Sequence, residues 1–151
     1  MNRKSWMVVL GLMALALGIG LSACGKLHPA PEVGILTYTP VVVPVSDTTT
    51  DSQVQVTFVV HNGVDAVLTS MQESVYRGTT RDTLATTFSR VRLSFPIDAA
   101  TTGAVLLITY PKAYKKNFAN YIGDSGIVVF YGEDAYGNGK TFSDSIGLSY
   151  D

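Results

Sequence analysis

Cys24 carries the only thiol of the sequence, and this thiol lies directly after an unbroken apolar stretch. The stretch runs from Trp6 to Leu21 and follows the basic residues Arg3 and Lys4. Its length of about 16 residues is short for a transmembrane helix, which needs about 20. The order of basic, apolar and small residues is typical of a secretory signal peptide. Two alternatives stay open here: a single-pass helix with an incidental cysteine, and a signal peptide that is cleaved elsewhere.

The residues Leu21, Ser22, Ala23 and Cys24 resemble the lipobox of bacterial lipoproteins. The resemblance implies that the Cys24 thiol receives diacylglycerol, that the chain is cut before Cys24, and that the new N-terminus is acylated, for example with palmitate. One acyl chain binds a membrane only marginally. The two or three chains implied here would make the attachment long-lived, so the membrane is the first expected partner.

The residue after Cys24 is Gly25 rather than aspartate. In many two-membrane bacteria, aspartate at this position of a lipoprotein favours retention in the inner membrane. The resemblance therefore implies the outer membrane, on its periplasmic side. The inner membrane and the outer face of a single cell membrane are the alternatives.

Catalytic motifs are absent from the sequence, so we expect no catalytic residues. Only two histidines occur, His28 and His61, and no His-x-x-x-His pair, Gly-x-Ser-x-Gly elbow or phosphate loop is present. His28 lies near two prolines, and His61 lies beside a turn, so both are expected in solvent. No cofactor is expected besides the lipid on Cys24.

Four acidic residues, Asp65, Asp124, Glu133 and Asp134, come close to predicted turns and strand ends. Loops at one end of a β-sandwich can gather carboxylates around calcium. Two facing carboxylates could also hydrolyse a glycosidic bond. Because aspartates are common turn formers and no EF-hand spacing is present, we predict turn roles and no metal site.

Tyr136 lies at the tip of a predicted hairpin, in the segment 134–140. An aromatic ring at a loop tip can stack on a sugar or on a protein partner. Tyr136 is thus a possible binding tip. The alternative is a ring that packs back onto its own hairpin.

The charge of the sequence excludes some classes of partner. The net charge is −1, and no basic excess indicates binding to nucleic acid. Lys112, Lys115 and Lys116 are close together, but we expect them on the solvated face of a helix. With Cys24 lipidated no disulfide can form, so packing alone must stabilise the exported domain.

The elements that position these residues are mostly strands. Residues 33–45 are rich in β-branched side chains but contain Pro40 and Pro44, which predicts an edge strand or a strand that switches sheets. Residues 53–63 alternate in polarity and end in Asn62-Gly63, a tight-turn signal that predicts a hairpin with 64–78. Further strands are expected at 83–97, at 103–111 as a central strand, and in a hairpin of 126–134 with 140–150.

One short helix is expected at 112–122, because Tyr114, Phe118, Tyr121 and Ile122 follow α-helical spacing. In the last strand, Asp144 interrupts the apolar face. An inward-pointing charge near a sheet edge discourages pairing with another chain, which explains Asp144 without a catalytic role.

The pattern of about seven short strands resembles an immunoglobulin-like or fibronectin-like antiparallel β-sandwich. Asp124 and Gly126 match the Asp-x-Gly that enters the penultimate immunoglobulin strand, but Val128 and Phe130 replace its tyrosine and cysteine. The expected organisation is a signal peptide at 1–23, a lipidated tether at 24–32 and a mainly β domain at 33–151.

The function predicted from the sequence is that of a lipid-anchored, non-enzymatic module of the cell envelope that binds an envelope protein. A carbohydrate-binding or peptidoglycan-binding module is the alternative, suggested by Tyr136 and the other tyrosines. A small hydrolase of envelope polymers is a third possibility, suggested by the acidic residues.

Overall fold

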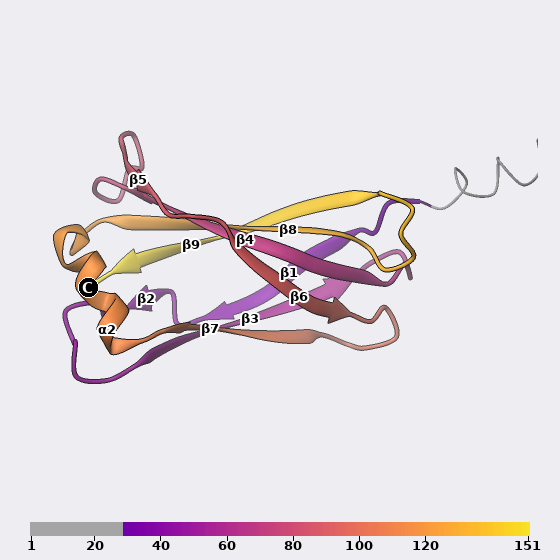
Figure 1. Ribbon diagram of the computed structural model, residues 1–151, viewed down its shortest axis with the longest axis horizontal. Helices are drawn as coiled ribbons and strands as arrows, with labels where there is room; N and C mark the ends of the chain where they lie inside the picture. The colour runs from indigo at the N-terminus through magenta and orange to yellow at the C-terminus, as the bar shows by residue number, and fades with distance from the viewer. Residues whose placement is uncertain (1–28) are drawn as a thin grey trace, which may run out of the picture.

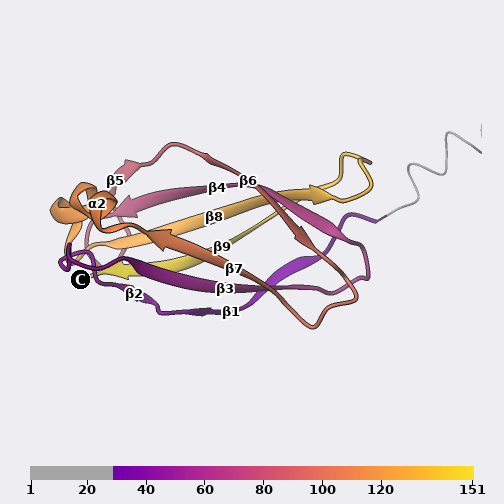
Figure 2. The ribbon, with the colours of Figure 1, turned by 60° about the horizontal axis from the view of Figure 1, so that its bottom comes forward.

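The computed structural model describes residues 29–151, which form two facing β-sheets (Figures 1 and 2). The predicted lipobox, most of the tether and His28 lie outside these residues. Three strands form one sheet in the order β1 (Val33–Thr39), β3 (Ser52–Val60) and β7 (Ala104–Tyr110). The second sheet follows the order β2 (Val42–Val43), β9 (Thr141–Tyr150), β8 (Ser125–Asp134), β4 (Ala66–Tyr76) and β5 (Leu84–Thr87), and β6 (Val91–Ile97) also pairs with β4.

The prediction of a mainly β, two-layer domain with one short helical segment is confirmed, although the strands number nine rather than about seven. All strand pairs are antiparallel except the two-residue pairing of β2 with β9. The predicted C-terminal hairpin is present as β8 and β9, paired from Ser125–Ser149 to Glu133–Thr141.

Strand β3 shows how alternation builds the layer between the sheets. Val54, Val56 and Phe58 are fully buried, while Gln53 and Gln55 are exposed on the outer face. The segment 33–45 changes sheets at Pro40, as predicted, because β1 pairs with β3 and β2 pairs with β9.

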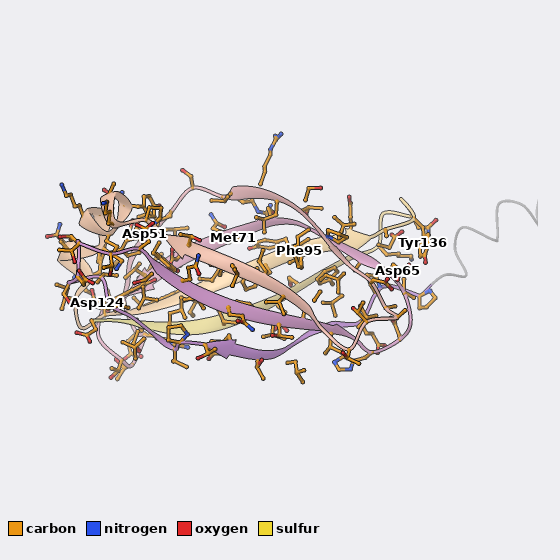
Figure 3. All side chains as sticks on the ribbon, turned by 90° about the horizontal axis from the view of Figure 1, so that it is seen from below. Asp51, Asp65, Met71, Phe95, Asp124 and Tyr136 are labelled. Atoms are coloured by element: carbon orange, nitrogen blue, oxygen red, sulfur yellow. The ribbon has the colours of Figure 1, made fainter. Side chains whose placement is uncertain are left out.

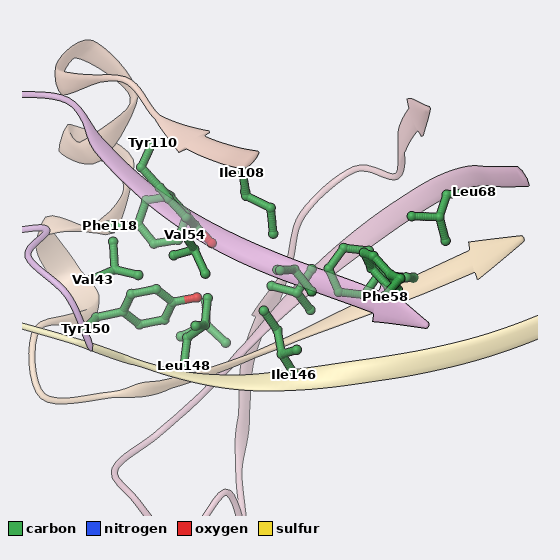
Figure 4. Close-up of a cluster of buried hydrophobic side chains, with 14 of the residues drawn as sticks. Val43, Val54, Phe58, Leu68, Ile108, Tyr110, Phe118, Ile146, Leu148 and Tyr150 are labelled. Carbon is green, nitrogen blue, oxygen red and sulfur yellow. The ribbon is translucent and has the colours of Figure 1, made fainter. Parts of the chain in front are cut away.

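The core lies between the layers and combines side chains from both (Figure 4). The Phe58 and Phe130 rings meet edge to face with centroids 5.1 Å apart, which joins β3 to β8. Such pairs prefer this geometry because the positive ring edge meets the negative ring face.

The predicted hairpin of residues 53–63 with 64–78 is wrong. β3 and β4 are consecutive, but they belong to different sheets. Gly63 does adopt positive φ (71°). The Asn62 side chain, however, accepts a hydrogen bond from the Glu32 amide and donates one to the Ala30 carbonyl, so the turn holds the beginning of the described chain.

The predicted central strand at 103–111 is also wrong, since β7 lies at the edge of the three-stranded sheet. Ile108 and Tyr110 face the core, whereas Val105 and Leu107 are 47% and 53% exposed. The apolar composition that suggested a central position comes from an uncovered outer face.

The predicted strand at 83–97 forms two strands that lie along the same edge of β4. β5 pairs with Ser74–Tyr76, and β6 pairs with Ala66–Met71. Between them, the Phe88 amide donates to the Glu73 carbonyl, and the Gln72 side chain donates to the Phe88 carbonyl. This break in the strand turns out to form the rim of a cavity.

The predicted helix at 112–122 is present as one α-turn, α2 (Lys112–Lys115), followed by the 3-10 helix η1 (Lys116–Tyr121). Contrary to the prediction, Lys115 is fully buried and Ile122 is 53% exposed. A 3-10 helix has three residues per turn, so Lys115, Phe118 and Tyr121 share the inner face. The Lys115 ammonium donates to the Asp47 carbonyl at 2.9 Å.

Candidate functional site

The four acidic residues singled out from the sequence do not form one site. Asp65 lies near one end of the molecule with Tyr136, and Asp124 lies at the opposite end (Figure 3). Asp124 forms an ion pair with Arg77 (2.9 Å) and accepts a hydrogen bond from the Gly78 amide. Among residues 29–151, no group of three histidine, cysteine, aspartate or glutamate side chains could hold a metal ion.

Asp134 stabilises the turn between β8 and β9. Its carboxylate accepts the backbone amides of Asn138, Lys140 and Tyr136 at 2.9–3.0 Å. These hydrogen bonds, led by that of Asn138, hold the pKa of Asp134 below its ordinary value. This is the turn role that was predicted for the acidic residues.

Tyr136 is 62% exposed, and its hydroxyl donates to Asp65 at 2.8 Å. This hydrogen bond raises the pKa of Tyr136. Asp65 also accepts the Ala99 amide, and the two hydrogen bonds lower the pKa of Asp65. The ring is therefore held by its hydroxyl while its faces stay largely open to solvent.

Sequence reasoning did not identify a cavity of about 310 Å³ between the two sheets. Its rim is formed by exposed residues of the β5–β6 link, β6, β7 and α2, namely Ser89, Val91, Thr109 and Tyr114. Its deeper wall includes the buried side chains Ile108 and Val128. The volume is near the lower end of the range for small-molecule pockets, about 300–1,000 Å³.

Glu73 brings a carboxylate into this otherwise apolar cavity. Its Oε1 atom accepts hydrogen bonds from the hydroxyls of Tyr110 (2.7 Å) and Tyr150 (2.5 Å). The two hydroxyls enter the space between the sheets from β7 and β9 (Figure 4). Burial raises the pKa of Glu73, and the two hydrogen bonds oppose this shift. Burial also raises the pKa of both tyrosines, whose ionisation the carboxylate disfavours further.

Gly126 makes room for this arrangement. A Cβ atom at position 126 would lie 2.0 Å from the Tyr150 hydroxyl oxygen and 2.7 Å from its Cζ atom. The Tyr150 ring therefore crosses the β8 backbone only because residue 126 has no side chain. The sequence did contain one signal for the site, namely Glu73 between Met71 and Val75 on the face of β4 that alternation turns inward.

The outer face of the three-stranded sheet is a second candidate. None of its strands, β1, β3 and β7, contains a charged residue. We define the uncharged face as the outward side chains Leu36, Thr37, Thr39, Gln53, Gln55, Thr57, Val105, Leu107 and Thr109. Interface centres are depleted in charge in the same way.

Comparisons with known proteins place the chain in no family. No protein-family model matches it, and no curated protein matches its sequence. Within the part of the chain that the structure describes, no helix is long and apolar enough to cross a bilayer. Among solved structures, the chain is similar to the crystal structure of Spo0M, a sporulation control protein from Bacillus subtilis. The match has 17% identity and a TM-score of 0.47, and it covers 82% of this chain but only 50% of that one.

Proposed function

We propose that this protein is a lipid-anchored, non-enzymatic module of the bacterial envelope that binds a protein partner through its uncharged face. The observation that carries the binding role is that face, in which three strands expose only uncharged side chains. Ordinary protein surfaces are rich in charge, and the centres of protein interfaces are depleted in charged residues. On this face Leu36, Val105 and Leu107 are exposed among threonine and glutamine side chains. The anchor is inferred from the lipobox at Leu21–Cys24.

The tether would orient the domain on the membrane. The Ala30 and Glu32 backbones are bonded to the Asn62 side chain, so only residues 25–29 separate Cys24 from a fixed point. The six Cα–Cα steps from Cys24 to Ala30 span at most about 22 Å when extended. The end of the molecule that carries Tyr136 and Asp65 would therefore lie close to the bilayer. The uncharged face would stand beside the membrane, accessible to a periplasmic protein.

The partner role can be tested by crosslinking in intact cells followed by mass spectrometry. We expect the wild type to capture a specific envelope protein and Leu107→Glu to lose it, because a charge would enter the uncharged face beside Gln55 of β3. Leu84→Glu is the matched control, since Leu84 is 54% exposed on β5 of the other sheet. Failure to capture any specific protein, or equal capture by both variants, would contradict the proposal.

The anchor can be tested separately with labelled palmitate. We expect the label on the wild type and none on Cys24→Ser, which should also keep its leader and lose the mature, membrane-bound form. A wild-type protein with a free thiol and an uncut leader would contradict lipidation. Sucrose-gradient separation of the membranes would then test the proposed outer-membrane location of the anchored form.

A carbohydrate-binding or peptidoglycan-binding role is the second candidate, and the exposed ring of Tyr136 favours it. A ring whose hydroxyl is fixed by Asp65 could stack on a sugar. Retention on purified cell wall by the wild type and its loss in Tyr136→Ala would support this function. We propose no hydrolase activity, because Asp124 lies at the other end of the molecule and Asp134 is engaged by three amides.

A further inference from the structure

The cavity between the sheets combines two kinds of group that rarely occur together in a protein interior. Three aromatic side chains, Phe88, Tyr110 and Tyr114, line it together with the Met71 thioether. The Phe88 and Tyr114 rings lie 6.3 Å apart with their planes inclined by 53°. Glu73 adds a carboxylate to this aromatic wall.

The Glu73 carboxylate keeps one oxygen for an occupant. Both tyrosine hydroxyls donate to Oε1. Among the described residues, no hydrogen bond engages Oε2, although Glu73 itself lines the cavity. No lysine or arginine belongs to the lining that the structure describes, so the charge of Glu73 is not neutralised by a neighbouring basic side chain.

This combination selects the chemistry of an occupant. An anion would meet the Glu73 carboxylate and the negative faces of the rings. A neutral apolar molecule would fill the cavity but leave the carboxylate with less water, which is unfavourable. An organic cation satisfies both parts, because its charge interacts with the carboxylate and the ring faces while its alkyl groups contact the apolar wall.

We propose that the cavity bounded by Met71, Glu73, Phe88, Tyr110 and Tyr114 binds a quaternary or alkylated ammonium group. Access is through the rim between β7 and the β5–β6 link, where Ser89, Val91 and Thr109 are exposed. The proposal goes beyond the proposed function and does not depend on it. The cavity opens at the side of the sandwich, whereas the uncharged face covers the outside of the three-stranded sheet, and Thr109 is the one residue that the cavity rim and the uncharged face share.

The test compares choline with 3,3-dimethylbutan-1-ol, which has the same shape but no charge. Each is titrated by calorimetry into the full chain in maltoside micelles. We expect choline to bind at least about tenfold more tightly, which corresponds to about 1.4 kcal/mol. Equal affinities, or no binding of choline, would overturn the proposal and leave a cavity that holds only water. This comparison uses the wild type, so it does not depend on a variant that folds.

Variants then locate the site. Glu73→Gln keeps the size of the side chain and should weaken choline at least about tenfold while leaving the neutral alcohol unchanged. Glu133→Gln is the matched control, because Glu133 is an exposed carboxylate on β8 and should have no effect. An equal loss of choline affinity in both variants would indicate general attraction by the negative charge of the protein and would overturn the proposed site. Partner capture through the uncharged face is measured in a separate experiment, so either idea can fail alone.

Discussion

Glu73 places a carboxylate between the two sheets, where an isolated charge would be costly. Tyr110 and Tyr150 reduce this cost by donating to the same oxygen. Hydrogen bonds to charged groups are stronger than those between neutral groups. The three side chains thus hold a carboxylate beside the apolar core through hydrogen bonds from two different strands.

The Tyr150 hydroxyl is one of the two donors to Glu73. Tyr150→Phe should lower the free energy of unfolding by about 1–3 kcal/mol, because it leaves Glu73 with a single donor. Urea denaturation measures this change. Tyr136→Phe removes a hydroxyl bond to Asp65 at the surface, so its effect should be clearly smaller. Equal losses in the two variants would show that the buried hydrogen bond to Glu73 contributes no more to the free energy of unfolding than the surface hydrogen bond to Asp65.

Glu73 also makes the free energy of unfolding depend on pH. Because burial raises the pKa of Glu73 above its ordinary value of 4.5, the folded protein binds this proton more tightly than the unfolded chain. The resulting stabilisation is complete below pH 4.5 and is lost as the pH rises through the raised pKa. Glutamine does not titrate, so Glu73→Gln has no such pH-dependent loss of stability. The free energy of unfolding of the variant minus that of the wild type should therefore increase from pH 4.5 to pH 8.

Urea titrations at several pH values check this difference. Asp65 and Asp134 have lowered pKa values, and their stabilisation is present above 3.8 and lost in more acidic solution. Both aspartates are present in the wild type and in Glu73→Gln, so their contribution cancels. A difference that is flat with pH would mean that Glu73 titrates equally in the folded and unfolded states.

The clearest constraint between two elements is the close approach of the Tyr150 ring, from β9, to the Gly126 backbone of β8. Gly126→Ala would force the Tyr150 ring away from Glu73, because the new Cβ would overlap the ring. Overpacking of this kind costs about 1–3 kcal/mol, which thermal or urea unfolding would detect. Gly147→Ala is the control, since its Cβ would meet only the movable end of the Arg81 side chain. A larger loss in the control would contradict this account.

The three lysines of the helical segment differ in burial, so their replacement should affect stability differently. Lys115→Ala should cost about 1.5–3 kcal/mol, because it removes a charged hydrogen bond to the Asp47 carbonyl and buried methylene groups. Lys116→Ala and Lys112→Ala change exposed side chains and should alter stability by less than about 0.5 kcal/mol. Chemical denaturation of the three variants would show whether Lys115, and not Lys112 or Lys116, is the buried lysine of this segment.

For the whole molecule, Asp144 links the two sheets where both have free edges. It lies on the inward face of β9, as the sequence predicted, and its carboxylate accepts the Ile35 amide of β1 at 2.9 Å. Asp144→Ala would leave this part-buried amide without a partner and should cost about 1–3 kcal/mol in unfolding free energy. Asp82→Ala, at an exposed loop position, should be nearly neutral. Similar losses would argue against a bridging role.

Short-range patterns in the sequence were enough to predict the local features of the fold. Alternation along β3, Pro40 between β1 and β2, and the turn of the β8–β9 hairpin all depend on residues a few positions apart. Such features follow from backbone sterics and from the two-residue period of a strand. The resemblance of Leu21–Cys24 to a lipobox is a local signal of the same kind, and lipidation of Cys24 stays a prediction for the palmitate experiment.

Which strands become neighbours, and what lies between them, depends on long-range packing. The hairpin signal at Asn62-Gly63 and the apolar run of β7 are compatible with several pairings, and packing of the two layers selected the observed one. Glu73 meets Tyr110 and Tyr150 across 37 and 77 residues of sequence. Contacts at that separation depend on how the whole core fills space, which no short pattern encodes.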